Sequence, residues 1–74
     1  MDWLRIVGAN IRRLREERDL SQEELGFKAE MDFGYLGKIE RGRRNPSLLK
    51  LVRIAEALDV DLPCLIVPDE SATH

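Results

Sequence analysis

Three arginines within four positions stand near the middle of the chain. Arg41, Arg43 and Arg44 belong to a segment that also contains Gly42 and Pro46, two residues typical of loops. In a loop, basic side chains lack the acidic partners that a helix places three or four positions away. A solvated helix face therefore does not explain this cluster, and its positive charge favours an anionic partner.

Residues suited to covalent or metal chemistry are scarce. The chain has one cysteine, Cys64, one histidine, the terminal His74, and no glycine-rich phosphate loop. These residues supply no pair of nucleophile and base, no cysteine or histidine metal site and no intrachain disulfide. We therefore expect no enzyme activity, no metal, no cofactor and no small-molecule ligand. Cys64 is interpreted as a small buried side chain.

The distribution of charge is more informative than its total. Twelve Lys and Arg against fourteen Asp and Glu give a net charge of -2, which by itself argues against a nucleic-acid partner. The charge is divided into blocks, with +3 over residues 1–15, -5 over 16–32, +5 over 38–53 and -5 over 54–74. The loop arginines thus belong to a basic centre between two acidic segments.

A length of 74 residues allows one small domain. A hydrophobic fraction of 43% is enough to form a core. We expect a single domain over residues 1–74, with its core at about residues 8–66 and with 67–74 as a tail. No apolar run approaches the ~20 residues that cross a bilayer, and residues 1–3 do not form the basic start of a secretory signal. These features predict a cytoplasmic protein with no membrane partner.

Apolar periodicity and capping signals predict an all-α fold. Ser21 and Glu24 form a capping box, and Asp32 is a second candidate N-cap. No alternating polar and apolar run indicates a strand. The expected helices cover about 3–18, 21–29, 33–41 and 47–58, followed by an apolar segment at 62–67.

Two short helices joined by a tight turn and flanked by longer ones are the arrangement of a helix-turn-helix. Four motifs at matching spacing resemble the XRE family of Cro- and phage-repressor-like regulators: Leu20-Ser21-Gln22-Glu23-Glu24-Leu25, Tyr35-Leu36-Gly37-Lys38-Ile39-Glu40-Arg41-Gly42, Arg44-Asn45-Pro46-Ser47-Leu48 and Ile54-Ala55-Glu56-Ala57-Leu58. The resemblance implies a lambda-repressor-like DNA-binding domain, a compact five-helix bundle. Among small relatives it favours restriction-modification controller proteins, with phage repressors and antitoxins as alternatives.

The resemblance also implies a surface for double-stranded DNA, made by Gln22, Phe33, Gly34, Tyr35, Gly37, Lys38, Arg41, Arg43 and Arg44. The three arginines are expected to contact phosphates whatever the base sequence. Gln22 is expected at a phosphate, with an exposed first-turn glutamine as the alternative. Lys38 is expected to donate to guanine or to a phosphate. Tyr35 is expected to reach a phosphate or to be a half-buried structural residue.

The recognition helix departs from the family pattern at its first two positions. Polar side chains are usual there, but Phe33 offers only apolar contact, as with a thymine methyl, and Gly34 offers no side chain. Phe33 packing in the core or at a dimer contact is an equal alternative.

The resemblance implies structural roles for three further residues. Arg15 and Glu40 match residues that form an ion pair between the first helix and the end of the recognition helix. Glu30 stands where the family commonly has glycine. The turn therefore either places Glu30 at a strained positive φ or adopts a conformation that glutamate accepts.

Apolar residues beyond the needs of a small core predict a homodimer, with an interface formed by Leu62, Leu65, Ile66 and Val67. For Leu62 and Leu65 closure of the monomer core is an equal alternative. Trp3 and Leu4 form a second apolar surplus. A two-fold dimer would place its recognition helices ~34 Å apart and require a palindromic site.

Together these expectations describe a sequence-specific transcriptional regulator that binds double-stranded DNA through the major groove, as a homodimer on a palindromic operator. The alternative is a protein-interaction module of the same fold, antitoxin-like or sequestering, with weak DNA binding. The acidic net charge and the few polar side chains on the recognition helix favour this alternative.

Overall fold

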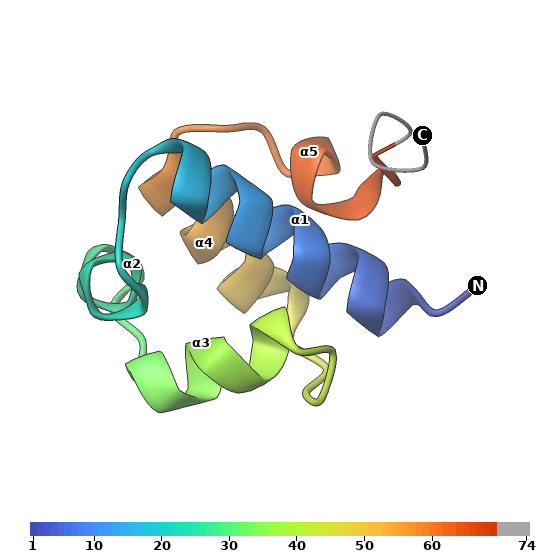
Figure 1. The fold of residues 1–74 in the computed structure, drawn as a ribbon, viewed down its shortest axis with the longest axis horizontal. Coiled ribbons are helices and arrows are strands. Elements are labelled where there is room, and N and C mark those ends of the chain that lie inside the picture. The colour runs from blue at the N-terminus through green and yellow to red at the C-terminus, as the bar shows by residue number, and fades with distance from the viewer. Residues whose placement is uncertain (70–74) are drawn as a thin grey trace.

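The computed structural model describes residues 1–69, which form five helices and no strand (Figure 1). The all-α prediction and the five-helix bundle are therefore confirmed. Residues 70–74, including the terminal His74, lie outside the described part. The helices are α1 (Trp3–Glu17), α2 (Gln22–Ala29), α3 (Phe33–Glu40), α4 (Leu48–Leu58) and α5 (Pro63–Ile66).

Side-chain caps fix where the helices begin. Ser21 Oγ accepts a hydrogen bond from the Glu24 backbone amide at 3.0 Å, and the Glu24 carboxylate accepts one from the Ser21 amide at 2.9 Å. These bonds stabilise the ionised carboxylate and lower the pKa of Glu24. Asp32 caps α3 and Ser47 caps α4 through bonds to backbone amides three residues ahead. The recognition helix α3 thus starts at a defined residue.

One apolar core holds all five helices, and α1 lies between α3 and α5, which contact its two sides (Figure 1). Its fully buried large side chains are Ile11, Leu25, Leu36, Ile39, Ile54, Leu58 and Leu65. Leu65 comes from the four-residue α5, so this short helix completes the core.

A buried asparagine fastens the last described segment to α1. Asn10 Nδ2 donates to the backbone carbonyls of Leu65 and Val67, at 2.9 Å each. Three residues on, Arg13 Nε lies 2.9 Å from the carboxylate of Asp69. Helix α5 is therefore held by polar bonds as well as by Leu65.

The turn between α2 and α3 places Glu30 in the left-handed region, at φ 55° and ψ 51°. Of the two interpretations that the sequence left open for Glu30, the strained positive φ applies, because left-handed backbone is costly for residues with a Cβ atom. Asp19 and Asp59 also adopt positive φ, but aspartate tolerates this region better than glutamate does.

Replacing Glu30 by glycine is expected to stabilise the protein. Glycine adopts positive φ without the steric cost, so the Glu30→Gly variant should gain about 1 kcal/mol in free energy of unfolding. Thermal unfolding followed by circular dichroism should show a melting temperature higher by about 4–8 °C. A variant that melts at or below the wild-type temperature would contradict strain at this position.

Helix α1 approaches the end of α3 so closely that residue 8 has no room for a side chain. A Cβ atom added to Gly8 would overlap the carbonyl oxygen of Ile39 and lie 2.6 Å from that of Glu40. Both obstacles are backbone atoms of the recognition helix, which cannot rotate away as a side chain would. Gly8 therefore sets the distance between α1 and α3.

The Gly8→Ala variant is expected to be less stable than the wild type. The overlap should cost about 3 kcal/mol, partly offset by about 1 kcal/mol of improved helix propensity. Chemical denaturation should therefore show a loss of about 2 kcal/mol. Gly34→Ala is the matched control, because Gly34 is exposed on α3 and its added Cβ would approach no backbone atom, only the side-chain carboxylate of Asp32 at 3.0 Å. If both alanine variants were equally stable, close contact at Gly8 would be excluded.

Candidate nucleic-acid interface

The outward surface of α3 carries few side chains. Leu36 and Ile39 point into the core, whereas Phe33, Gly34 and Lys38 are exposed. Phe33 keeps 50% of its surface accessible and is not part of the apolar core cluster. The interpretation that Phe33 packs in the core of the monomer is therefore wrong. The exposed surface of α3 presents the ring of Phe33 and the ammonium group of Lys38.

Gly37 is buried under the side chain of Gln22, which crosses from α2. A Cβ atom at Gly37 would lie 3.3 Å from Gln22 Oε1 and 3.4 Å from Nε2. Gln22 Nε2 donates to Glu40 Oε1 at 3.1 Å. The interpretation of Gln22 as a merely exposed first-turn glutamine is thus wrong, because its side-chain amide is held against α3. Gly37 is corrected from a contact residue to one that makes room for this amide.

The expected partners Arg15 and Glu40 form an ion pair that reaches from α1 to the end of α3. Arg15 Nε lies 2.7 Å from Glu40 Oε2, and Arg15 Nη2 lies 3.1 Å from Oε1. The Glu40 side chain is 2% exposed and that of Arg15 12%. Hydrogen bonding to Glu40 raises the pKa of Arg15, and burial opposes this shift. Because Glu40 also accepts from Gln22, one carboxylate joins three helices.

Every arginine of the loop after α3 is exposed and has no acidic partner within residues 1–69. Gly42 turns the chain there with φ +73°, close against the side chain of Arg5. The arginines in question are Arg41, Arg43 and Arg44. By contrast, Arg12, Arg13 and Arg18 of α1 and its C-cap all lie within 4 Å of a carboxylate. The loop arginines thus remain available to an external anion.

Tyr35 is half-buried and packs against the core, in agreement with its structural alternative. The Lys50 ammonium lies 4.4 Å from the centre of its ring, within the range of a cation–π contact. Sequence reasoning did not single out Lys50 as a site residue, although it belongs to the basic block. Its place beside Tyr35 in the first turn of α4 is visible only in the folded chain.

An apolar groove of about 220 Å³ lies between the start of α1, the loop before α4, and α5. It is lined by Trp3, Leu4, Val7, Asn45, Pro46, Leu51 and Ile66. The two apolar surpluses expected from the sequence therefore meet at one surface. Ile66 and Val67 are exposed, as a dimer contact requires. Leu65, however, is fully buried, so it is corrected from an interface residue to a core residue. Leu62 is partly buried against the core, in agreement with its core alternative.

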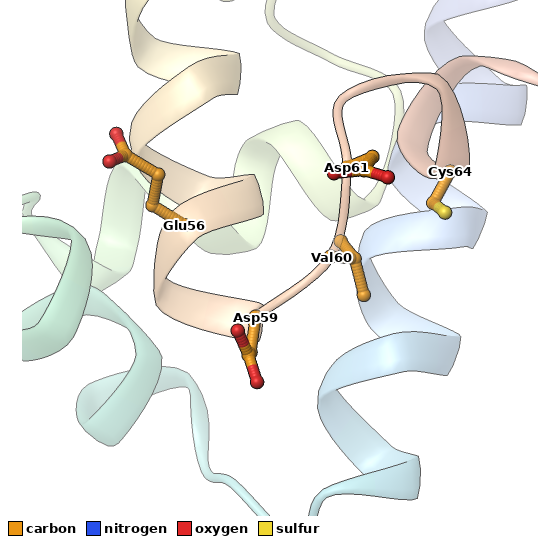
Figure 2. A pocket seen from close by; sticks show the side chains of 5 residues that line it. All are labelled: Glu56, Asp59, Val60, Asp61 and Cys64. Carbon is orange, nitrogen blue, oxygen red and sulfur yellow. The ribbon is translucent and has the colours of Figure 1, made fainter.

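Leu48 continues the apolar stripe of α4 in the sequence, but its side chain is not buried. Leu48 and its neighbour Leu49 are 63% and 73% exposed at the start of α4. Cys64 was expected to be buried, but its side chain is also exposed. It lines a hollow with Glu56, Asp59 and Asp61, whose carboxylates point in different directions (Figure 2). No group of residues within 1–69 is arranged to hold a metal ion.

Within residues 1–69, no helix has the length and apolar character required to cross a membrane.

Comparison with known proteins places this arrangement among transcriptional regulators. A sequence model described as helix-turn-helix matches residues 11–63. The HTH-type transcriptional regulator y4dJ of Sinorhizobium fredii is 41% identical over 70 residues, which are 95% of this chain and 91% of y4dJ. The restriction-modification controller protein C.AhdI from Aeromonas hydrophila superposes with a TM-score of 0.83 at 41% identity, over 85% of this chain and 96% of its own. SinR, a master regulator of biofilm formation solved in complex with DNA, gives 0.76 at 37% identity, over 80% and 95%.

Proposed function

We propose that this chain, which belongs to the helix-turn-helix family of DNA-binding transcriptional regulators, acts as a homodimer that places α3 of each subunit in the major groove of a palindromic operator. The observation that carries the proposal is the set of exposed loop arginines, without acidic partners within residues 1–69, that follow the exposed surface of α3.

The proposed interface divides into phosphate contacts and base contacts. Arg41, Arg43 and Arg44 extend from the end of α3 and neutralise phosphates. Gln22 also contacts a phosphate, because within residues 1–69 Glu40 accepts one of its two amide protons and no other acceptor takes the second. Lys38 is the side chain of α3 that can donate to the N7 and O6 acceptors of guanine.

Lys50 adds a phosphate contact that is absent from the family resemblance. Its ammonium group is held over Tyr35 of α3, and it forms no ion pair within residues 1–69. A Lys50→Gln variant should lower the salt slope of DNA binding by about one unit.

The apolar groove between Trp3, Leu51 and Ile66 is the proposed contact between subunits. Val67, the residue after Ile66, is a further exposed apolar side chain. A monomer of this size gains stability when such a surface is covered by a second copy. Two-fold symmetry of the protein then requires a two-fold symmetric DNA site.

Binding to DNA is tested by titrating labelled random duplex fragments with the purified protein at several salt concentrations. Two subunits with three loop arginines each should lose about 10³-fold in affinity between 50 and 200 mM salt. Sequencing of the retained fragments should return two half-sites related by a dyad. Absence of binding even at low salt would reject the regulator and leave the protein-interaction module of the same fold.

Self-association is tested by sedimentation equilibrium of the free protein and of an Ile66→Asp variant. The wild type should sediment as a dimer, and the variant as a monomer, because a carboxylate in an apolar contact loses its hydration. The matched control is Cys64→Ser, whose exposed side chain lies outside the groove. A wild-type monomer at all concentrations, on or off DNA, would reject the homodimer.

A further inference from the structure

We infer that Phe33 reads the C5 methyl group of a pyrimidine in the operator, so that thymine and 5-methylcytosine are both preferred to their unmethylated counterparts at the base it contacts. This inference rests on the proposed binding of α3 in the major groove, and it adds the chemical group that is recognised there. The protein would accordingly respond to cytosine methylation of its site.

Phe33 is placed rigidly at the leading end of the recognition helix. It is the first residue of α3, and its backbone lies against α2, where a Cβ atom on Gly26 would come within 3.4 Å of both Phe33 Cα and Cβ. Asp32 fixes the first turn, since its carboxylate accepts from the Tyr35 amide at 3.0 Å. The half-exposed ring is therefore presented to the outside from a fixed base.

The surroundings of Phe33 contain few groups that distinguish one base from another by hydrogen bonding. Gly34 is exposed without a side chain, and Gly37 is covered by Gln22. Asp32 already caps α3, and Tyr35 is half-buried beside Lys50. A phenyl ring has neither a hydrogen-bond donor nor an acceptor, so contact at this position depends on apolar surface alone.

In the major groove, the C5 methyl group is the apolar feature that a base pair offers. Thymine presents this methyl beside its O4 acceptor, whereas cytosine presents an amino group and no methyl. Methylation of cytosine at C5 adds the same group at the same place. A reader limited to apolar contact therefore responds to the methyl group more than to the rest of the base.

Charge complementarity brings this ring to DNA rather than to another partner. Lys38 and the loop arginines follow Phe33 along the same segment, and none of them is paired with an acid within residues 1–69. Phosphate contacts at the far end of α3 hold the helix against the duplex, while Phe33 meets the base edges.

The test uses the operator recovered from random duplex fragments and changes one pyrimidine position of both half-sites at a time. Four duplexes are compared at each position, with thymine or uracil opposite adenine and with 5-methylcytosine or cytosine opposite guanine. At the base that Phe33 contacts, each methyl should raise affinity about fourfold, and about 16-fold with both half-sites changed. Each ratio is taken within one base pair, so the complementary purine does not affect it.

A Phe33→Ala variant should bring both ratios to about one while binding remains salt-dependent, and Phe33→Leu should keep part of them. Lys38→Ala is the matched control, since it should weaken binding but leave the methyl ratios unchanged. Equal affinity for thymine and uracil at every position, or ratios that survive in Phe33→Ala, would overturn the inference and leave the proposed DNA binding intact. Absence of any DNA binding would reject both.

Discussion

Replacing Arg15 by alanine is expected to lower the free energy of unfolding by about 3 kcal/mol. The change leaves Glu40, whose side chain is 2% exposed, with Gln22 as its remaining side-chain partner, and it also removes the bond from Arg15 to the backbone carbonyl of Leu20. A buried carboxylate that loses its cation keeps the cost of desolvation without the compensating attraction. Thermal unfolding should therefore shift down by at least about 12 °C.

The matched control for Arg15 is Arg12, three residues earlier on the same helix. Arg12 Nε lies 3.5 Å from the carboxylate of Glu16, but both side chains are more than half exposed. An exposed pair of this kind contributes at most about 1 kcal/mol, so Arg12→Ala should melt close to the wild type. Similar melting temperatures for the two variants would mean that the buried pair does not stabilise the fold.

Replacing the three loop arginines by glutamine is expected to reduce DNA affinity at 0.1 M salt by about 10²–10³-fold for each subunit that binds. Each neutralised phosphate releases about 0.9 counterion, so the salt slope per subunit should fall by about 2.7. The stability of the fold should change little, because Arg41, Arg43 and Arg44 are exposed and unpaired within residues 1–69. Fluorescence anisotropy titrations from 50 to 200 mM salt measure both quantities.

Arg53 provides the control for charge alone. It belongs to the same basic block of the sequence, but it lines a hollow between α2 and α4 together with Lys28, Glu30 and Glu56. Arg53→Gln should leave the salt slope unchanged. A slope that falls equally for loss of Arg53 and of a loop arginine would show that net charge, rather than position, governs binding.

Local signals in the sequence predicted the helix boundaries well. The capping box of Ser21 and Glu24 and the N-cap Asp32 act within three residues, so their effect does not depend on the rest of the fold. Arg15 and Glu40 are 25 positions apart, so no local signal could predict that they pair. Only the family resemblance implied this ion pair.

Burial was harder to predict than helicity. Periodicity identifies an apolar stripe on a helix, but not how far along this stripe the neighbouring helices pack. Leu48 continues the stripe of α4, yet it is 63% exposed in the first turn of the helix. Cys64 and Leu65 are adjacent residues of α5, and only docking on α1 determines that Leu65 is the one buried.

The recognition surface depended on contacts between helices that the sequence does not encode locally. The amide of Gln22 lies over Gly37 because the turn at Glu30 sets α2 across α3. Glycine disfavours a helix relative to alanine, but one of the two glycines of α3, Gly37, is needed for that crossing. Sequence reasoning therefore identified the elements of the site without the arrangement of its side chains.

The bonds from Asn10 to the carbonyls of Leu65 and Val67 close a loop of 55 residues or more. Helix α5 itself is a single turn of four residues at the end of the described chain, too short to be stable without these bonds and its packing on α1. We therefore expect α5 to be the segment that opens first, with its amides the earliest to exchange with solvent in the native state. Since Ile66 also belongs to the proposed subunit contact, protection of these amides should increase with protein concentration, and folding of the last helix and assembly would form one equilibrium.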